Sequence, residues 1–255
     1  MDEIEALTDA QTAAFRCDGF VFAPGFYDRA EMAAISAWIE EVAAWPEAPG
    51  RHMVYHEDSL STPDKRLLQR VEDVTPFHAG LKALFTRGRM RQAVGQLLGE
   101  PAVLFKDKIN FKMPGGDGFK AHQDVQAGWN AYASYHVSVL VGIDAATQAN
   151  GCLEMAAGWH DRGLIGTEWD PLAEAEVAAM NFVSYPTEPG DAVFFDSFVP
   201  HRSAPNLSGG PRRALYVTYN RASEGDQRAR YVADKRKSFP PDIEREPGKS
   251  YVFRV

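Results

Sequence analysis

The spacing of hydrophobic residues changes near residue 100, and this change limits the folds open to the chain. Before it, apolar side chains recur at helical spacing, as in 28–45, where Met32, Ile35, Ile39 and Val42 share one face. After it come short β-type runs separated by Gly, Pro and Asn: AVLFKDKINFKM, YHVSVLVGID, NFVSYPT, DAVFFDSFV and RALYVTYN. Because strands do not alternate with helices, the pattern favours a mainly β fold with N-terminal helices, a β-sandwich or jelly roll, over a βαβ sheet.

The length of 255 residues, 45% of them hydrophobic, is enough for one domain with a sizeable core. We expect a single domain over 1–255, divided into mostly helical support with a polar lid loop over 46–66 (1–100), a jelly-roll core (101–222) and a C-terminal helix and tail (223–255). Thr8 and Gly19 are predicted to begin and end a first helix, and a further helical zone is predicted over 77–99.

Composition and charge exclude several classes of protein. The formal net charge is −8, which argues against nucleic acid or an anionic membrane as the main partner and leaves a small anionic or zwitterionic molecule open. The two cysteines form no disulfide framework and no zinc pattern. No secretory leader or 18-residue apolar run appears, so we expect a cytoplasmic protein; the sequence leaves a homo-oligomer open.

Two His-x-acid tripeptides are candidate metal sites. With 7 His and 35 acidic residues in 255 positions, about one is expected by chance. His56-Glu57-Asp58 lies in the polar stretch and is interpreted as solvated loop. His122-Gln123-Asp124 follows a Gly-rich turn between strand-like runs, where residues i and i+2 share one face. His122 and Asp124 would supply two of the three ligands of a facial triad, which leaves open positions on Fe(II) for a chelating cosubstrate and O2.

The third ligand and an anion-binding residue are expected further along the chain. His201 ends the run DAVFFDSFVP, and Arg212 begins the next strand-like run. A guanidinium there could bind the far carboxylate of a dicarboxylate in a bidentate pair. Arg213 would point to the opposite face, because side chains alternate along a strand.

These motifs, taken in order, resemble the phytanoyl-CoA dioxygenase family of iron(II)/2-oxoglutarate oxygenases. The resemblance covers about 15–235 and includes DGFVFAPGF, KINFKMPGG and GDAVFFDSFVPHRS. It implies a double-stranded β-helix, cupin-like, with Fe(II) held by His122, Asp124 and His201. It also implies that 2-oxoglutarate is bound by Arg212 and Ser203, with Asn110 and Ser138 near it.

The resemblance narrows further to a bacterial branch that hydroxylates 2-aminoethylphosphonate at the carbon next to phosphorus, with release of succinate and CO2. The segments LLQRVEDV, RALYVTYNRASEGDQRARYVADKR and FPPDIEREPGK carry it. Such a substrate needs cations for the phosphonate and carboxylates or aromatic rings for the ammonium. The candidates for these roles are Lys108, Arg202, Arg221, Glu72, Trp129 and Tyr135.

Alternatives stay open at this point. Lys106, Lys108, Asn110 and Lys112 share one face of a predicted strand, which could be solvated or could face the site. The same chemistry could act on an acyl-CoA or another small polar metabolite. A jelly-roll protein that only binds a metal or ligand is the alternative from another class, and it would need no 2-oxoglutarate.

Overall fold

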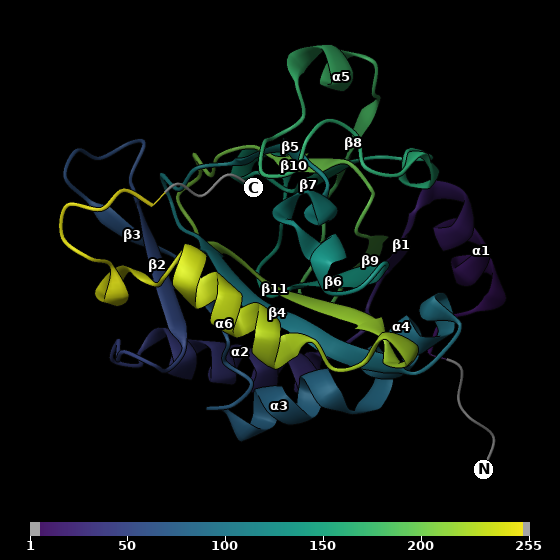
Figure 1. The fold of residues 1–255 in the computed structure, drawn as a ribbon, viewed down its shortest axis with the longest axis horizontal. Coiled ribbons are helices and arrows are strands. Elements are labelled where there is room, and N and C mark those ends of the chain that lie inside the picture. The colour runs from purple at the N-terminus through teal and green to yellow at the C-terminus, as the bar shows by residue number, and fades with distance from the viewer. Residues whose placement is uncertain (1–5, 252–255) are drawn as a thin grey trace.

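Two antiparallel β-sheets that face each other form the centre of the molecule (Figure 1). The computed structural model describes residues 6–251. The strands are β1 (Phe20–Ala23), β2 (Met53–Asp58), β3 (Arg66–Glu72), β4 (Ala102–Lys112), β5 (Phe119–His122), β6 (His136–Gly142), β7 (Leu153–Ala156), β8 (Phe182–Tyr185), β9 (Ala192–Asp196), β10 (His201–Ser203) and β11 (Arg212–Arg221). The larger sheet has the order β1-β9-β6-β11-β4-β3-β2 and the smaller one β5-β10-β7-β8. The predicted jelly-roll, double-stranded β-helix fold is confirmed.

The helices are α1 (Asp9–Asp18), α2 (Arg29–Ala43), α3 (Ala79–Thr86), α4 (Gly88–Leu98), α5 (Glu174–Ala178) and α6 (Arg228–Ser238). Helices α2, α3 and α4 cover the outer face of the larger sheet, whereas α1 lies beside β1 and α5 lies beyond the smaller sheet (Figure 1). Within residues 6–251, no helix combines the length and apolar character needed to span a membrane.

The helix boundaries follow local signals in the sequence. Thr8 caps α1 by accepting a hydrogen bond from Gln11 N, and Gly19 ends it with φ 84°, a conformation that favours glycine. Asp28 caps α2 in the same way as Thr8. The predicted helical zone over 77–99 is two helices, because Arg87 is extended between α3 and α4.

The apolar face of α2 packs in the main core, as its spacing predicts. Met32, Ile35, Ile39 and Val42 are all buried there, together with sheet residues such as Ile109. Burying each such side chain contributes about 1.5–3 kcal/mol. The helices therefore hold the larger sheet from behind and leave its other face to the site.

The prediction of one polar lid loop over 46–66 is wrong. Residues Met53–Asp58 form β2, which pairs with β3. The larger sheet therefore includes these two strands, which precede residue 101, where the jelly-roll core was expected to begin. Tyr55 stacks on Phe239, and its hydroxyl donates to the Phe239 carbonyl at 2.9 Å. His56 lies in this strand, with Nδ1 3.1 Å from Asp242 Oδ2. The strand was missed because its second half is polar, and the side-chain contacts that bury it come from the other end of the chain.

Strand β4 has one face toward the helices and one toward the smaller sheet. Ile109 and Phe111 pack in the helix-covered core, whereas Lys106, Lys108 and Asn110 line a cavity between the sheets. A register shift opposite Thr218/Tyr219 marks a bulge near the start of this polar run. Of the two orientations left open by the sequence, the structure has the one in which the polar face points inward.

Candidate metal and substrate site

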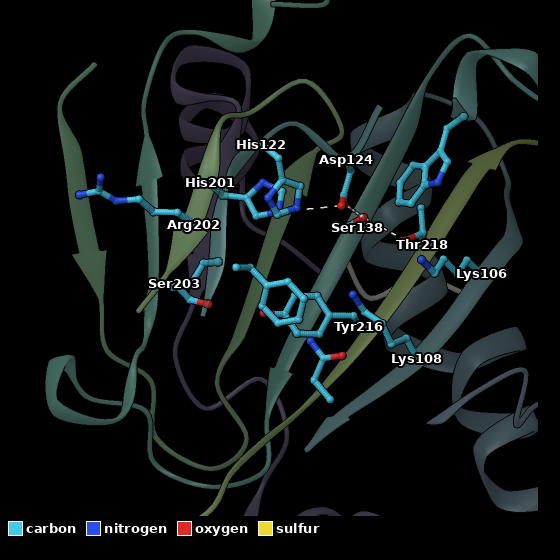
Figure 2. A pocket seen from close by; sticks show the side chains of 14 residues that line it. Lys106, Lys108, His122, Asp124, Ser138, His201, Arg202, Ser203, Tyr216 and Thr218 are labelled. Atoms are coloured by element: carbon cyan, nitrogen blue, oxygen red, sulfur yellow. Dashed lines mark hydrogen bonds and ion pairs between the residues drawn. The ribbon is translucent and has the colours of Figure 1, made fainter. Parts of the chain in front are cut away.

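The two histidines and the aspartate of the predicted triad meet at one end of this cavity. β5 and β10 are paired so that His122 lies opposite His201, and Asp124 follows β5 in a short 3₁₀ turn. One potential ligand atom from each residue lies within 4.8 Å of the others. His201 Nε2 is 3.9 Å from Asp124 Oδ1 (Figure 2). We refer to His122, Asp124 and His201 as the metal-ligand cluster.

Hydrogen bonds orient all three side chains of the cluster. Nδ1 of His122 is 2.7 Å from the Lys120 carbonyl, and Nδ1 of His201 is 2.9 Å from the Val199 carbonyl, which leaves Nε2 of each ring for a metal. Ser138 donates to Asp124 Oδ2 at 2.8 Å and lies 2.9 Å from the Thr218 hydroxyl. Two imidazole nitrogens and one carboxylate oxygen on one side of an open cavity fit Fe(II).

The pKa shifts in the cluster favour metal binding. Burial, aided by His201, lowers the pKa of His122 to about 3. Burial alone would raise the pKa of Asp124, but His201, His122 and the nearby lysines hold it below its usual value. Neutral imidazoles and an ionised carboxylate are the forms that ligate a metal.

Two glutamines hold the turn that carries Asp124 in place by hydrogen bonds, a role that the sequence did not indicate. Gln123 is fully buried, and its Nε2 donates to the carbonyls of Gly163 at 2.9 Å and Phe198 at 2.6 Å. Gln126 Nε2 donates to the Thr167 and Asp170 carbonyls. The segment between β7 and β8 is thereby tied to the metal-binding turn.

The cavity is lined mainly by polar and charged residues and, together with its open mouth, has a volume of about 480 Å³. Its walls come from both sheets (Figure 2). The lining residues are Lys106, Lys108, Asn110, Phe119, His122, Asp124, Trp129, Ser138, Leu153, His201, Arg202, Ser203, Tyr216 and Thr218. Among them are six residues predicted from the sequence to bind cosubstrate or substrate: Asn110, Ser138, Ser203, Lys108, Trp129 and Arg202.

Lys106 and Lys108, which we call the lysine pair, are the prominent cations of the cavity. Burial would lower the pKa of Lys106, but Tyr231, Glu72 and Asp124 together raise it above its usual value. Burial, together with the charge of Lys106, lowers the pKa of Lys108 to about 7. One lysine is therefore fully charged at neutral pH, and its neighbour titrates there.

Arg212 is buried on the same face of β11 as Tyr216, but it lines a smaller neighbouring pocket, which shares Leu153 with the cavity, and is not among the residues that line the cavity itself. Arg212 Nε has no hydrogen-bond partner within residues 6–251, so this buried donor is free to bind an anion. Arg213 points the other way and binds Asp144 at 2.8 Å, as the alternation predicted. Opposite Arg212 in β4, Lys112 donates to Ser203 Oγ at 2.7 Å. Arg212, Ser203 and Asn110 thus offer polar groups that fit 2-oxoglutarate.

Three predicted substrate residues lie outside the cavity lining. Glu72 is buried behind it, paired with Arg70 at 2.7 Å and Lys235 at 2.6 Å. Tyr135 packs under the Arg221 guanidinium, 4.8 Å away, and Arg221 is also 3.9 Å from Glu100. Their contacts hold them elsewhere, so the structure does not bring them to the substrate.

Two further predicted residues have different contacts from those expected. Arg202 lines the rim, but its side chain points away from the lysine pair and pairs with Glu154 at 2.5 Å (Figure 2). Ser138 orients the Asp124 carboxylate, as described above.

The sequence analysis missed Tyr216 and Thr218 as cavity residues, although a signal was present. Both lie on the Arg212 face of β11, and counting in steps of two from Arg212 reaches them. Phe119 and Leu153 gave no comparable signal, because β5 and β7 are only four residues long.

Comparison with known proteins shows similarity in both sequence and fold. The phytanoyl-CoA dioxygenase (PhyH) family model matches residues 15–214. A 2-aminoethylphosphonate dioxygenase from an uncultured bacterium (HF130_AEPn_1) is 43% identical, over 96% of this chain and 93% of its own. A methylphosphonate hydroxylase from Gimesia maris is 41% identical, over 91% of this chain and 88% of its own.

Among solved structures, EctD from S. alaskensis with 2-oxoglutarate and 5-hydroxyectoine has the same fold. Its TM-score is 0.75 at 20% identity, over 100% of this chain and 89% of that one. The family match spans well over half of this chain and contains the whole metal-ligand cluster. The chain therefore belongs to the phytanoyl-CoA dioxygenase family, and it is an iron(II)- and 2-oxoglutarate-dependent dioxygenase.

Proposed function

We propose that the chain hydroxylates a small organophosphonate at the carbon next to phosphorus. The observation that carries this proposal is the lysine pair on the inner face of β4, in the same small cavity as the metal-ligand cluster. Two neighbouring ammonium groups suit a doubly charged phosphonate. The two relatives above 40% identity act, by their names, on phosphonates.

The residues divide the work between them. His122, Asp124 and His201 hold Fe(II), and Arg212 binds the far carboxylate of 2-oxoglutarate, beside Ser203 and Asn110. When bound, these groups and O2 supply oxidation of a C–H bond to C–OH, balanced by conversion of one 2-oxoglutarate to succinate and CO2. Lys106 and Lys108 fix the phosphonate so that its α-carbon faces the metal-ligand cluster.

The character of the cavity argues against an acyl-CoA as substrate. Only three of the fourteen lining residues, Phe119, Trp129 and Leu153, are apolar, so an acyl chain, whose binding comes from apolar contact, would find few partners there.

The test is succinate formation by protein loaded with Fe(II) and 2-oxoglutarate under nitrogen and then exposed to oxygen. We expect succinate formation to rise with added methylphosphonate or 2-aminoethylphosphonate. One molecule of succinate should form for each molecule of hydroxylated product. Equal succinate with and without every phosphonate tried would refute the phosphonate substrate. If the protein bound no 2-oxoglutarate at all, a ligand-binding role would replace the catalytic one.

A further inference from the structure

The cavity has more cationic than anionic side chains, and this excess affects which phosphonate it can bind. Of the fourteen lining residues, Lys106 and Lys108 are cations deep in the cavity, and Asp124 is the carboxylate. Asp124 belongs to the metal-ligand cluster, and its Oδ2 already accepts a hydrogen bond from Ser138. Within residues 6–251, the lining offers no second carboxylate to a positively charged substrate group.

Two carboxylates beside the cavity, Glu72 and Glu154, are paired with cations of the protein. Glu72, behind the lysine pair, is 2.7 Å from Arg70 and 2.6 Å from Lys235. Glu154, beside the rim, is 2.5 Å from Arg202. An ammonium group would have to displace one of these partners, at the cost of leaving a charge unpaired.

The aromatic rings of the cavity are also occupied. Lys106 Nζ lies 5.4 Å from the centre of the Trp129 ring, and Lys108 Nζ lies 4.8 Å from the Tyr216 ring and 5.7 Å from the Phe119 ring. These distances are within the range of cation–π attraction. Each of these three rings therefore already has a lysine ammonium within cation–π distance, with which a substrate ammonium would compete.

One acceptor in the cavity is uncommitted, but it is neutral. Asn110 Oδ1 has no hydrogen-bond partner among the described residues. It lies between Lys108 and Lys112 on the inner face of β4. An ammonium bound there would have two like charges as strand neighbours, and an amide oxygen does not offset them.

From these contacts we infer that the cavity discriminates against an ammonium group, so that the preferred substrate is a phosphonate with a neutral side chain. This rests on the proposed function and specifies its substrate class. The lysine pair attracts the phosphonate and, by covering the aromatic rings, repels a cation at the other end of the same molecule.

The discriminating experiment compares substrates that differ in charge alone. Propylphosphonate has a methyl group where 2-aminoethylphosphonate has its ammonium, so the two have nearly the same size. We expect kcat/KM from succinate formation to be at least about tenfold higher for propylphosphonate, and methylphosphonate to be accepted as well. Calorimetric titration of the protein under nitrogen gives the binding preference without turnover.

A variant tests the assigned cause. Lys106→Met uncovers the Trp129 ring, and the preference for propylphosphonate over 2-aminoethylphosphonate is expected to fall about tenfold while both bind more weakly. Lys106→Arg keeps the charge and should keep the preference. Lys82→Met, at an exposed lysine on α3, is the matched control and should change neither value.

The outcomes separate the two proposals. Equal or better use of 2-aminoethylphosphonate by the unaltered protein would overturn the inference and leave the phosphonate function standing. Succinate formation that no phosphonate stimulates would overturn the proposed function, and the inference with it. An unchanged preference in Lys106→Met would also overturn the assigned role of Lys106.

Discussion

The metal-ligand cluster and the lysine pair share one cavity, but they are held in place differently. Each histidine of the cluster is oriented by a carbonyl two residues away, on the short strands β5 and β10. Lys106 instead has its charge maintained by Glu72 on β3 and Tyr231 on α6, far away in the sequence. Local contacts therefore orient the rings of the two histidines, whereas the charge of the lysine pair depends on side chains far away in the sequence.

This difference predicts whether a substitution at each end of the cavity lowers activity or stability. Damage to a metal ligand should abolish chemistry and leave the fold, because few other residues depend on it. Damage to the residues behind the lysine pair should first lower stability, because several buried charges share the same partners.

The largest effect is expected from His201→Ala. This substitution removes a metal ligand. Removing a group that only orients a ligand lowers metal affinity by about 10–100-fold, so here the iron affinity should fall by more than about 100-fold. Iron binding under nitrogen and succinate formation measure this. His56→Ala, at a histidine on β2 distant from the cluster, is the control; normal turnover by His201→Ala would exclude it as a ligand.

Glu72→Gln should have the next largest effect, on stability. It leaves Arg70 and Lys235 without their buried carboxylate, and removing one partner of a buried pair costs about 3–5 kcal/mol. Since each kcal/mol shifts Tm by about 2–4 °C at this size, thermal unfolding should occur roughly 6–20 °C lower. Glu31→Gln breaks an exposed pair with Arg89 and should cost about 1 kcal/mol at most. Equal Tm for the two variants would contradict the contrast between the ends of the cavity.

Arg212→Gln should mainly weaken cosubstrate binding. Losing one partner of a buried charge pair costs about 2 kcal/mol or more, so the KM for 2-oxoglutarate should rise about 30-fold, with little change for the phosphonate. Arg213→Gln is the matched control, because Arg213 pairs with Asp144 outside the cavity. A larger KM change in Arg213→Gln would reverse the assignment.

The smallest effect is a pH dependence from Lys108. Its pKa is lowered to about 7 by burial and by Lys106, so it is charged below pH 7 and neutral above. As the pH rises from 6 to 8 the charged form falls to about one tenth, and the KM for the phosphonate should rise by up to about tenfold. The substrate also titrates in this range, so Lys108→Arg is the comparison: it stays charged, and its profile should lose this step. Identical profiles would assign the step to another group.

The sequence predicted the metal end of the cavity better than the phosphonate end. His122, Asp124 and His201 were identifiable because the order of their motifs resembles the phytanoyl-CoA dioxygenase family, although Asp124 lies in a 3₁₀ turn after β5 and not on the strand. The inward orientation of Lys106 and Lys108 was left open, because alternation shows which residues share a face and not which face is inside. The strands β5, β7 and β10 were missed because they have only three or four residues each and β10 is distant from its partners in the chain. The strand β2 was missed because its second half, His56–Asp58, is polar.

The ion-pair partners of the phosphonate end show the same limit. Glu72 was expected to contact substrate as the partner of an ammonium group, and the fold places it behind the cavity with Lys235 of α6. Nothing within β3 indicates this, because the contact spans more than 160 positions.

By itself the sequence determined the ends of the first helix, the apolar face of α2 and the division between Arg212 and Arg213, because each depends on capping or on the period of a helix or strand, and the order of its motifs identified the triad and the two-sheet fold. Only the tertiary structure decided that the polar face of β4 lines the cavity and that its lysines cover the aromatic rings. Both features depend on how the two sheets and α6 pack. A buried charge is stable only where other parts of the chain, here distant in sequence, supply its partners.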